Sequence, residues 1–374
     1  MINYSIPADF NLETINRIEI LNSQYENSKI TETYGQISVD NIYGSGRAND
    51  LIPQVDRHNL EAYVNYLHKR NLQFNYTLNT TCLANNEFTE EGLEHLRSFI
   101  HWIENIGITT ITVAMPSLIQ IIRHFSKNLK IKASTVCQIT NANKAVMFQS
   151  IGASRMVVDE TINRDFTTLR NIRNAFGNGV ELIVNVICHK NCIFEMFHHN
   201  QTSHDNHSNK ENPSVSYYSH MCMLQRCDRP STLLKLNWIR PEDISLYVRE
   251  TGIDQFKIQG RQAALSGQIL KTTEFYMKQS YSGNLMQLLD SFSPTNRFQV
   301  FLDNKSLDHF IEPFYKNENF CKNNCTSCGY CDKYISRCAD TKAVQTVFNS
   351  ACMFYKSYVT YLLNQITKTE NIND

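Results

Sequence analysis

The sequence predicts an α/β protein folded as a (β/α)8 barrel, and three observations support this. Short β-rich runs alternate with amphipathic helical stretches through the middle of the 374 residues, the order expected of parallel βα units. Eight such runs can be counted, which is the number that closes a barrel. Neither a GxGxxG turn after a strand nor a Walker A motif occurs. An open doubly wound sheet is the alternative on pattern alone.

The predicted strands are apolar or β-branched runs bounded by polar or turn residues. They cover residues 30–38, 72–79, 108–114, 130–135, 154–159, 180–186, 233–239 and 256–259. Because the loops that follow barrel strands gather at one end, we expect side chains just beyond these runs to share one face.

Three of the intervening helices have clear start and stop residues. Thr89 is placed to cap a helix that ends at Gly107, and Asp165 to cap one that ends at Gly177. Pro241 stands in the first turn of a third helix. The inward positions predicted for the first two are Leu93, Leu96, Ile100 and Ile103, then Phe166, Leu169, Ile172 and Phe176.

Composition limits the class of protein. Lys and Arg together equal Asp and Glu together at 36 each, so the basic surplus of nucleic-acid-binding proteins is missing and such a partner is not favoured. The first 22 residues lack the basic start and apolar run of a signal peptide, and no 18 apolar residues run together. We therefore expect a soluble, cytoplasmic chain without a membrane segment. In that reducing compartment, its twelve cysteines are more often metal ligands than disulfides.

Two segments interrupt the βα alternation and define the expected domain organisation. Residues 1–290 form the barrel, including a cysteine- and histidine-rich insertion at 188–232 after the sixth predicted strand. Residues 291–374 form a cysteine-rich extension that ends in a helix over 341–367. Loops this long within a compact domain are usually functional or disordered.

The insertion contains Cys188, Cys192, Cys222 and Cys227. Cys188 lies just past a predicted strand and emerges at the functional face, with the others within reach of the same metal. Four thiolates suit a [4Fe–4S] cluster, and zinc is the competing metal. Six histidines in this segment have three possible interpretations: metal ligands, acid–base groups, or ordinary residues of a polar loop. They are His189, His198, His199, His204, His207 and His220.

The extension repeats the metal pattern as Cys321-x3-Cys325-x2-Cys328-x2-Cys331, followed by Cys338. Overlapping CxxC steps indicate a metal site. Structural zinc, a second cluster, and completion of the insertion's site are three open readings. The remaining cysteines, Cys82, Cys137 and Cys352, stand alone.

Polar residues at strand ends are expected to line a pocket. They are Asn79, Ser134, Asp159, Asn185, Lys257, Gln259 and Arg261. Lys257 and Arg261 suit an anionic substrate such as a carboxylate, and salt bridges within the barrel are the alternative.

Several motifs over residues 34–283 carry a resemblance to a known family. They lie at Tyr34–Arg47 (YG…GSGR), 75–83 (NYTLNTTCL), 159–166 (DETINRDF), 188–192 (CHKNC), 199–204 (HN…SH), 238–243 (WIRPED) and 252–261 (GIDQFKIQGR). Taken together, the chain resembles peptidase family U32, the collagenase-like proteins.

The resemblance implies two chemistries. Some members are described as metal-dependent, collagen-degrading proteases. Others carry a [4Fe–4S] cluster and support oxygen-independent hydroxylation of ubiquinone precursors, transfer RNA or ribosomal RNA, with prephenate as an implied oxygen source, and can work in pairs. Cys188, Cys192 and Cys227 match the ligand region best, with Cys222 as the fourth ligand and Cys82 as its alternative. The spacing Cys188-x3-Cys192 is tighter than in that branch, and its short members lack the tail cysteines.

The function expected is therefore an iron–sulfur protein that catalyses or supports redox modification of a small molecule, peptide or RNA. The catalytic residues expected are Asn79, Asp159, Asn185, His199, His204, Lys257 and Arg261. One alternative is a metal-dependent peptidase, which without an HExxH motif would use loop histidines with Glu195 or Asp205. The other is a non-catalytic partner subunit that docks through Tyr217 and Tyr218.

Overall fold

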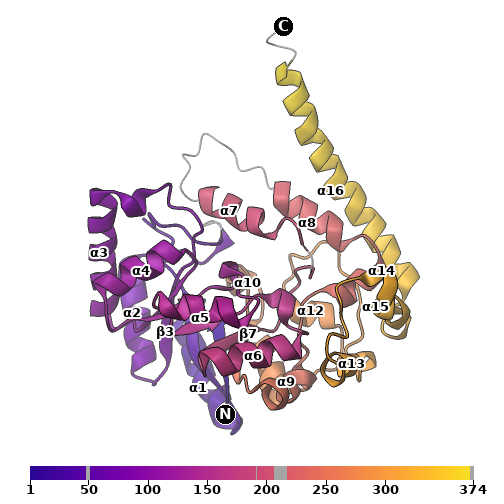
Figure 1. Ribbon diagram of the computed structural model, residues 1–374, viewed down its shortest axis with the longest axis horizontal. Coiled ribbons are helices and arrows are strands. Elements are labelled where there is room, and N and C mark those ends of the chain that lie inside the picture. The colour runs from indigo at the N-terminus through magenta and orange to yellow at the C-terminus, as the bar shows by residue number, and fades with distance from the viewer. Residues whose placement is uncertain (48–50, 191, 206–216, 371–374) are drawn as a thin grey trace.

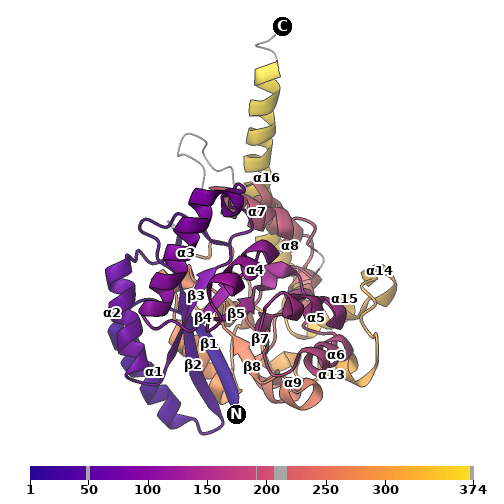
Figure 2. The same ribbon diagram turned by 60° about the vertical axis from the view of Figure 1, so that its left-hand side comes forward.

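The computed structural model describes residues 1–47, 51–190, 192–205 and 217–370. Its centre is a closed parallel barrel in which each strand pairs with its neighbours along the chain and β1 pairs with β8. Figure 2 shows the strands surrounded by helices. The strands are β1 (Ile2–Pro7), β2 (Ser28–Gly35), β3 (Gln73–Leu78), β4 (Thr110–Val113), β5 (Lys130–Ala133), β6 (Arg155–Val157), β7 (Val180–Ile183) and β8 (Gln255–Lys257). The predicted (β/α)8 fold is confirmed.

One helix on the outer wall follows each strand. These helices are α1 (Leu12–Gln24), α2 (Arg57–His68), α3 (Glu90–Asn105), α4 (Pro116–Phe125), α5 (Ala142–Ser150), α6 (Phe166–Phe176), α9 (Ile244–Thr251) and α11 (Ile269–Lys278). The predicted caps form: Thr89 accepts the Gly92 amide at 3.0 Å and Asp165 the Thr168 amide at 2.9 Å. The predicted inner stripes are buried, except that Leu93 is half-buried and Phe99 is buried in addition.

Two strand predictions are wrong. The first strand is β1, at the start of the chain, which the sequence analysis did not identify. Conversely, residues 233–239 form no strand: a 3-10 helix, η5 (Pro230–Lys235), is followed by a single bridge at Leu236. This run is apolar because it is buried under the extension, where Trp238 donates its indole N–H to the Leu233 carbonyl at 2.8 Å. A short apolar run alone does not distinguish a strand from other buried segments.

The barrel interior contains a buried network of charges. Lys132 on β5 lies 2.6 Å from both Glu32 on β2 and Glu181 on β7. Arg155 on β6 lies 2.6 Å from Glu32, and Asn75 donates to the same carboxylate at 3.0 Å. The two carboxylates are therefore matched by two cations, and this pairing allows the four charges to be buried together.

The insertion follows β7, one strand later than predicted because β1 adds a strand before the others. Its helices α7 (Glu195–Asp205) and α8 (Tyr217–Arg226) lie beyond the barrel end, and α16 (Thr341–Glu370) runs past α8 and out of the body (Figure 1). His220 on α8 stacks on Tyr358 of α16 with ring centroids 4.0 Å apart. No helix in the described ranges is both long and apolar enough to cross a membrane.

The segment after residue 290 packs onto the barrel. It contains η7 (Lys305–Leu307), α13 (Glu312–Lys316), α14 (Cys325–Cys328), α15 (Tyr330–Tyr334) and η8 (Ile335–Arg337), after α12 (Leu285–Leu289). The buried Arg240, just before the 3-10 turn η6 (Pro241–Asp243), donates to the Asn304 carbonyl at 2.9 Å and pairs with Asp243 and Asp308 at 3.0 Å each. One buried guanidinium therefore joins barrel and extension.

Candidate active site at the barrel mouth

A cavity of about 100 Å³ lies at the carboxyl ends of the strands. Five of the seven strand-end residues predicted to line a pocket do so, namely Asn79, Ser134, Lys257, Gln259 and Arg261. The insertion contributes Cys188, Cys192, Phe194, Glu195, His198, His199 and Cys222. Barrel and insertion thus form the site together.

Three thiols reach this cavity. Cys188 follows β7, Cys192 precedes α7, and Cys222 lies on α8. A hydrogen bond from the Cys222 thiol lowers the pKa of Cys192 to about 6, which makes Cys192 the more acidic thiol of this pair. Burial raises the pKa of Cys188, and the bond to Cys192 raises that of Cys222. The three thiols of the site therefore differ in acidity, and Cys192 is the most acidic of them.

The fourth predicted thiol lies elsewhere. Cys227 is buried among apolar side chains, and burial raises its pKa to about 11. Its carbonyl lies 3.5 Å from the Cys352 sulfur on α16. Cys82, the alternative fourth ligand, does not line the cavity either. The structure thus brings Cys222 into the site and leaves Cys227 out.

Cationic side chains form the opposite side of the cavity. Burial lowers the pKa of Lys257 to about 8, and its ammonium lies 3.9 Å from the centre of the Tyr34 ring. Burial, with Arg47 nearby, lowers the pKa of Arg261 to about 10. Arg261 hydrogen-bonds Gln36 and, at 3.3 Å, Asn79. These groups give the cavity a positive side suited to an anion.

Two carboxyl groups lie next to the thiols. Burial raises the pKa of Glu195 to about 9, with the negative charges of Glu160 and Asp159 adding to the shift. Burial and Asp159 also raise the pKa of Glu160, which accepts a 2.6 Å hydrogen bond from Thr135. Crowded acids in a poorly hydrated place retain protons, so Glu195 is a carboxylic acid at neutral pH.

Two histidines of α7 line the cavity in their neutral form. Burial, followed by repulsion from Arg47, lowers the pKa of His198 to about 4 and that of His199 to about 3. A neutral imidazole can accept a proton or bind a metal. His204, predicted as catalytic, is exposed at the other end of α7 and lies outside the cavity.

Two other predicted catalytic residues have structural contacts instead. Asp159 accepts the Thr161 amide at 2.8 Å and caps a 3-10 turn, η4 (Glu160–Ile162). The Asn185 side chain accepts the Gln259 amide at 2.7 Å and donates to the Leu289 carbonyl at 3.2 Å. Neither lines the cavity.

The other insertion residues named from the sequence are also placed. His189 forms a bridge with Leu236, and His207 lies outside the described residues. Tyr217 and Tyr218, expected to form an exposed docking surface, are half-buried, with Tyr218 stacked on Phe197 at 5.7 Å.

Sequence reasoning gave little weight to three of the lining residues. Arg47 lies in the loop between β2 and α2, Glu160 opens η4 after β6, and Glu195 opens α7 after β7. Each lies on the chain that leaves a strand at the mouth, which is the signal that would have identified them.

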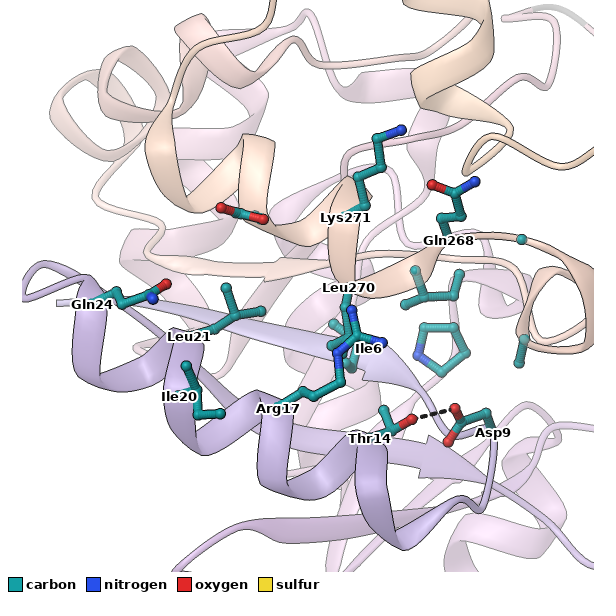
Figure 3. A pocket seen from close by; sticks show the side chains of 15 residues that line it. Ile6, Asp9, Thr14, Arg17, Ile20, Leu21, Gln24, Gln268, Leu270 and Lys271 are labelled. Carbon is teal, nitrogen blue, oxygen red and sulfur yellow. Dashed lines mark hydrogen bonds between the residues drawn. The ribbon is translucent and has the colours of Figure 1, made fainter.

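An open groove of about 760 Å³ lies on the outer wall, between α1 and α11 (Figure 3). Arg17 and Leu21 of α1 line it on one side, and Leu270 and Lys271 of α11 line it on the other. No cysteine or histidine is among its lining residues. The mouth cavity is the better candidate because the active sites of such barrels lie at the carboxyl ends of their strands.

The described residues contain no ready-made metal site. No three of their His, Cys, Asp or Glu side chains stand together in positions that could coordinate an ion. At the mouth, the thiols share a cavity without that geometry. The tail cysteines Cys321, Cys325, Cys328 and Cys331 line a different cavity in the extension.

Fold and site together define a (β/α)8-barrel protein with a thiol-rich cavity at its functional face. The profile of peptidase family U32 matches residues 38–280, and the chain belongs to this family. It is 27% identical over 348 residues to the "uncharacterized protease MJ1657" of Methanocaldococcus jannaschii, with 91% of this chain and all of that protein covered. A solved U32 peptidase, Mk0906, superposes with a TM-score of 0.51 at 18% identity, covering 70% of this chain and 93% of that one. The latter likeness supports the fold alone.

Proposed function

We propose that this chain is an iron–sulfur protein that catalyses or supports redox modification, of the oxygen-independent hydroxylation kind, of an anionic small molecule, peptide or RNA. The observation that carries the proposal is that Cys188, Cys192 and Cys222 share one cavity with Lys257 and Arg261. Thiolates are the ligands of iron–sulfur clusters. Paired cations suit carboxylate or phosphate oxygens.

The three cysteines at the mouth could serve as three ligands of an iron–sulfur cluster. Three thiols from two stretches of chain face the cavity, and the pKa of Cys192 is lowered there. Cys227 is packed in the apolar core, so we assign Cys188, Cys192 and Cys222 as the protein ligands. When bound, a cluster supplies electron transfer or activation of a bound substrate.

The other lining residues have definable roles around such a group. Lys257 and Arg261 hold the anionic part of the substrate at the barrel side. His199 accepts a hydrogen bond or a proton as a neutral imidazole, and Glu195 carries a proton beside the thiols. Helices α7 and α8 cover the mouth (Figure 1) and limit the access of water.

The test is anaerobic purification followed by assays of iron and acid-labile sulfide for the full chain and two serine variants. We expect Cys192→Ser to lose iron and sulfide, and Cys227→Ser to retain both. A colourless wild-type protein containing zinc at the mouth would overturn the proposal. Loss of iron from Cys227→Ser would instead refute the three-thiol assignment.

A metal-dependent peptidase is the second candidate. Glu160, Glu195, His198 and His199 share the cavity, and hydrolysis with a bound metal needs such ligands and a carboxylate base. Gelatin cleavage that a chelator abolishes would support it. The informative pair is His199→Ala against His204→Ala, because His204 is on the same helix but outside the cavity. Equal activity of the two variants would exclude this site for peptide hydrolysis.

We also propose a cytoplasmic location. All twelve cysteines are free thiols, which supports a reducing compartment. The test is fractionation of cells. Detection of the chain among periplasmic or secreted proteins would contradict a cytoplasmic location.

A further inference from the structure

The extension contains a second group of thiols, separate from the barrel mouth. Cys321, Cys325, Cys328 and Cys331 all line one cavity of about 30 Å³. Cys325 and Cys328 are exposed, whereas Cys321 and Cys331 are half-buried. None of these residues lines the mouth cavity, so the proposed function does not use them.

The local backbone brings the thiols together. Asn324 caps α14 by accepting the Ser327 amide at 3.3 Å. Gly329 then takes a left-handed conformation, with φ of +61°, between α14 and α15. This reversal, which glycine adopts without steric cost, returns Cys331 to the cavity that Cys328 lines. Two cysteines separated by two residues across such a turn are typical of structural zinc sites.

An aromatic cluster holds the two half-buried thiols in place. Phe320 and Tyr330, the sequence neighbours of Cys321 and Cys331, pack edge to face with centroids 5.1 Å apart. Phe314 packs against Phe320 at the same separation. The phenol of Tyr330 donates to a backbone carbonyl at 3.0 Å. Two of the four sulfur atoms therefore sit on a rigid frame.

Cations from the barrel side face the thiols. The Lys190 ammonium lies 3.4 Å from the Cys321 sulfur, and the buried Arg164 guanidinium interacts with both Cys321 and Cys331. Four thiolates around a divalent ion carry two net negative charges, which Lys190 and Arg164 balance.

We propose that Cys321, Cys325, Cys328 and Cys331 bind a single zinc ion that fastens the extension to η5, the return arm of the insertion. The cavity that the four thiols share is small, about 30 Å³, and four cysteines are a common ligand set of a single structural zinc ion. No three ligands are in coordinating positions within the described ranges, so binding requires the exposed Cys325 and Cys328 side chains to rotate inward.

The attachment to η5 follows from existing contacts. Asp332, next to Cys331, hydrogen-bonds Ser231 and pairs with Lys235 at 3.1 Å. The Cys331 sulfur lies 3.9 Å from the Leu234 carbonyl. A zinc ion at Cys331 therefore holds the arm that leads back from Cys222 toward the barrel.

The test uses the full chain, reduced and then incubated with Zn²⁺ alone, with bound zinc counted per chain after desalting. We expect Cys328→Ser to bind one ion fewer than wild type, and Cys352→Ser, a half-buried thiol on α16, to match wild type. Cys192→Ser should also retain the extension's ion, which separates this site from the mouth. Hydrogen exchange of η5 and α15 should quicken in Cys328→Ser.

Three results would overturn the proposal. The first is equal zinc in Cys328→Ser and wild type. The second is loss of iron and sulfide, rather than zinc, from Cys328→Ser, which would identify a second cluster. The third is failure of the reduced Cys192→Ser variant to bind zinc.

Discussion

Replacing Lys132 by methionine tests whether the charge network inside the barrel balances as its distances suggest. The ammonium is fully buried, 2.6 Å from each of Glu32 and Glu181, whose side chains are 3% and 2% exposed. The variant leaves two buried carboxylates with Arg155 alone. Removing one partner of a buried ion pair costs about 3–5 kcal/mol. We expect about 3 kcal/mol of lost stability, at the low end, because Arg155 still pairs with Glu32 at 2.6 Å.

The pH dependence gives a second check on the same variant. Burial alone would raise the pKa of Glu32, but Lys132 and Arg155 outweigh it and hold that pKa well below 4.5. A carboxyl with a depressed folded-state pKa contributes stability above its unfolded pKa and loses it as pH falls toward the folded value. The deficit of Lys132→Met should therefore be full near neutrality and should narrow as pH falls below 4.5.

The assay is urea unfolding followed by tryptophan fluorescence, since Trp238 is buried. Lys130→Met is the matched control, because Lys130 begins the same strand but is exposed, and it should change stability by less than about 0.5 kcal/mol. If the two variants unfold at the same urea concentration near neutrality, the network does not provide the stabilisation inferred from its geometry.

Three further predictions concern separate parts of the molecule. The pKa of Lys257 is lowered to about 8, so its charge is present below that pH and lost above it. Binding of a small carboxylate, measured by calorimetry, should therefore weaken as pH rises past 8, and Lys257→Met should remove this pH dependence. A wild-type affinity independent of pH would refute the prediction. Asp165→Ala removes the cap of α6 and should cost about 1 kcal/mol in urea unfolding, while an unchanged midpoint would show that the cap contributes nothing. Arg240→Met leaves the buried Asp243 unpaired and should lower the free energy of unfolding by about 3–5 kcal/mol, with the extension becoming sensitive to proteases. Protease resistance equal to wild type would show that Arg240 does not hold the extension on the barrel.

The sequence was sufficient to predict the elements whose patterns are local. Helix α6 was predicted with its cap at Asp165 and its stop at Gly177, both of which the structure shows, because capping depends on neighbours in sequence. The run at 233–239 misled for the opposite reason. Its burial comes from the extension, which is distant in sequence: Trp238 packs against Phe310 with ring centroids 5.7 Å apart.

The site divides in the same way. Lys257 ends β8 and Arg261 lies just beyond it, and both could be predicted because position relative to a strand determines which end of the barrel a residue reaches. The sequence could not show which of Cys222 and Cys227 reaches the cavity. Cys222 lies on α8 and Cys227 just after it, and the packing of α16 beside Cys227 determines where each thiol points. The protonated state of Glu195 depends on Glu160, 35 positions earlier, which no local pattern reveals.

The ring of strands has a practical consequence for anyone who works with part of this protein. The segment shared with the family profile begins at residue 38, after β1 and β2 have ended. A fragment trimmed to that segment would lose both strands and open the circle between β3 and β8. Two raw edges of unpaired backbone would then face solvent, ready to associate with other copies. The first 37 residues close the circle and prevent this aggregation.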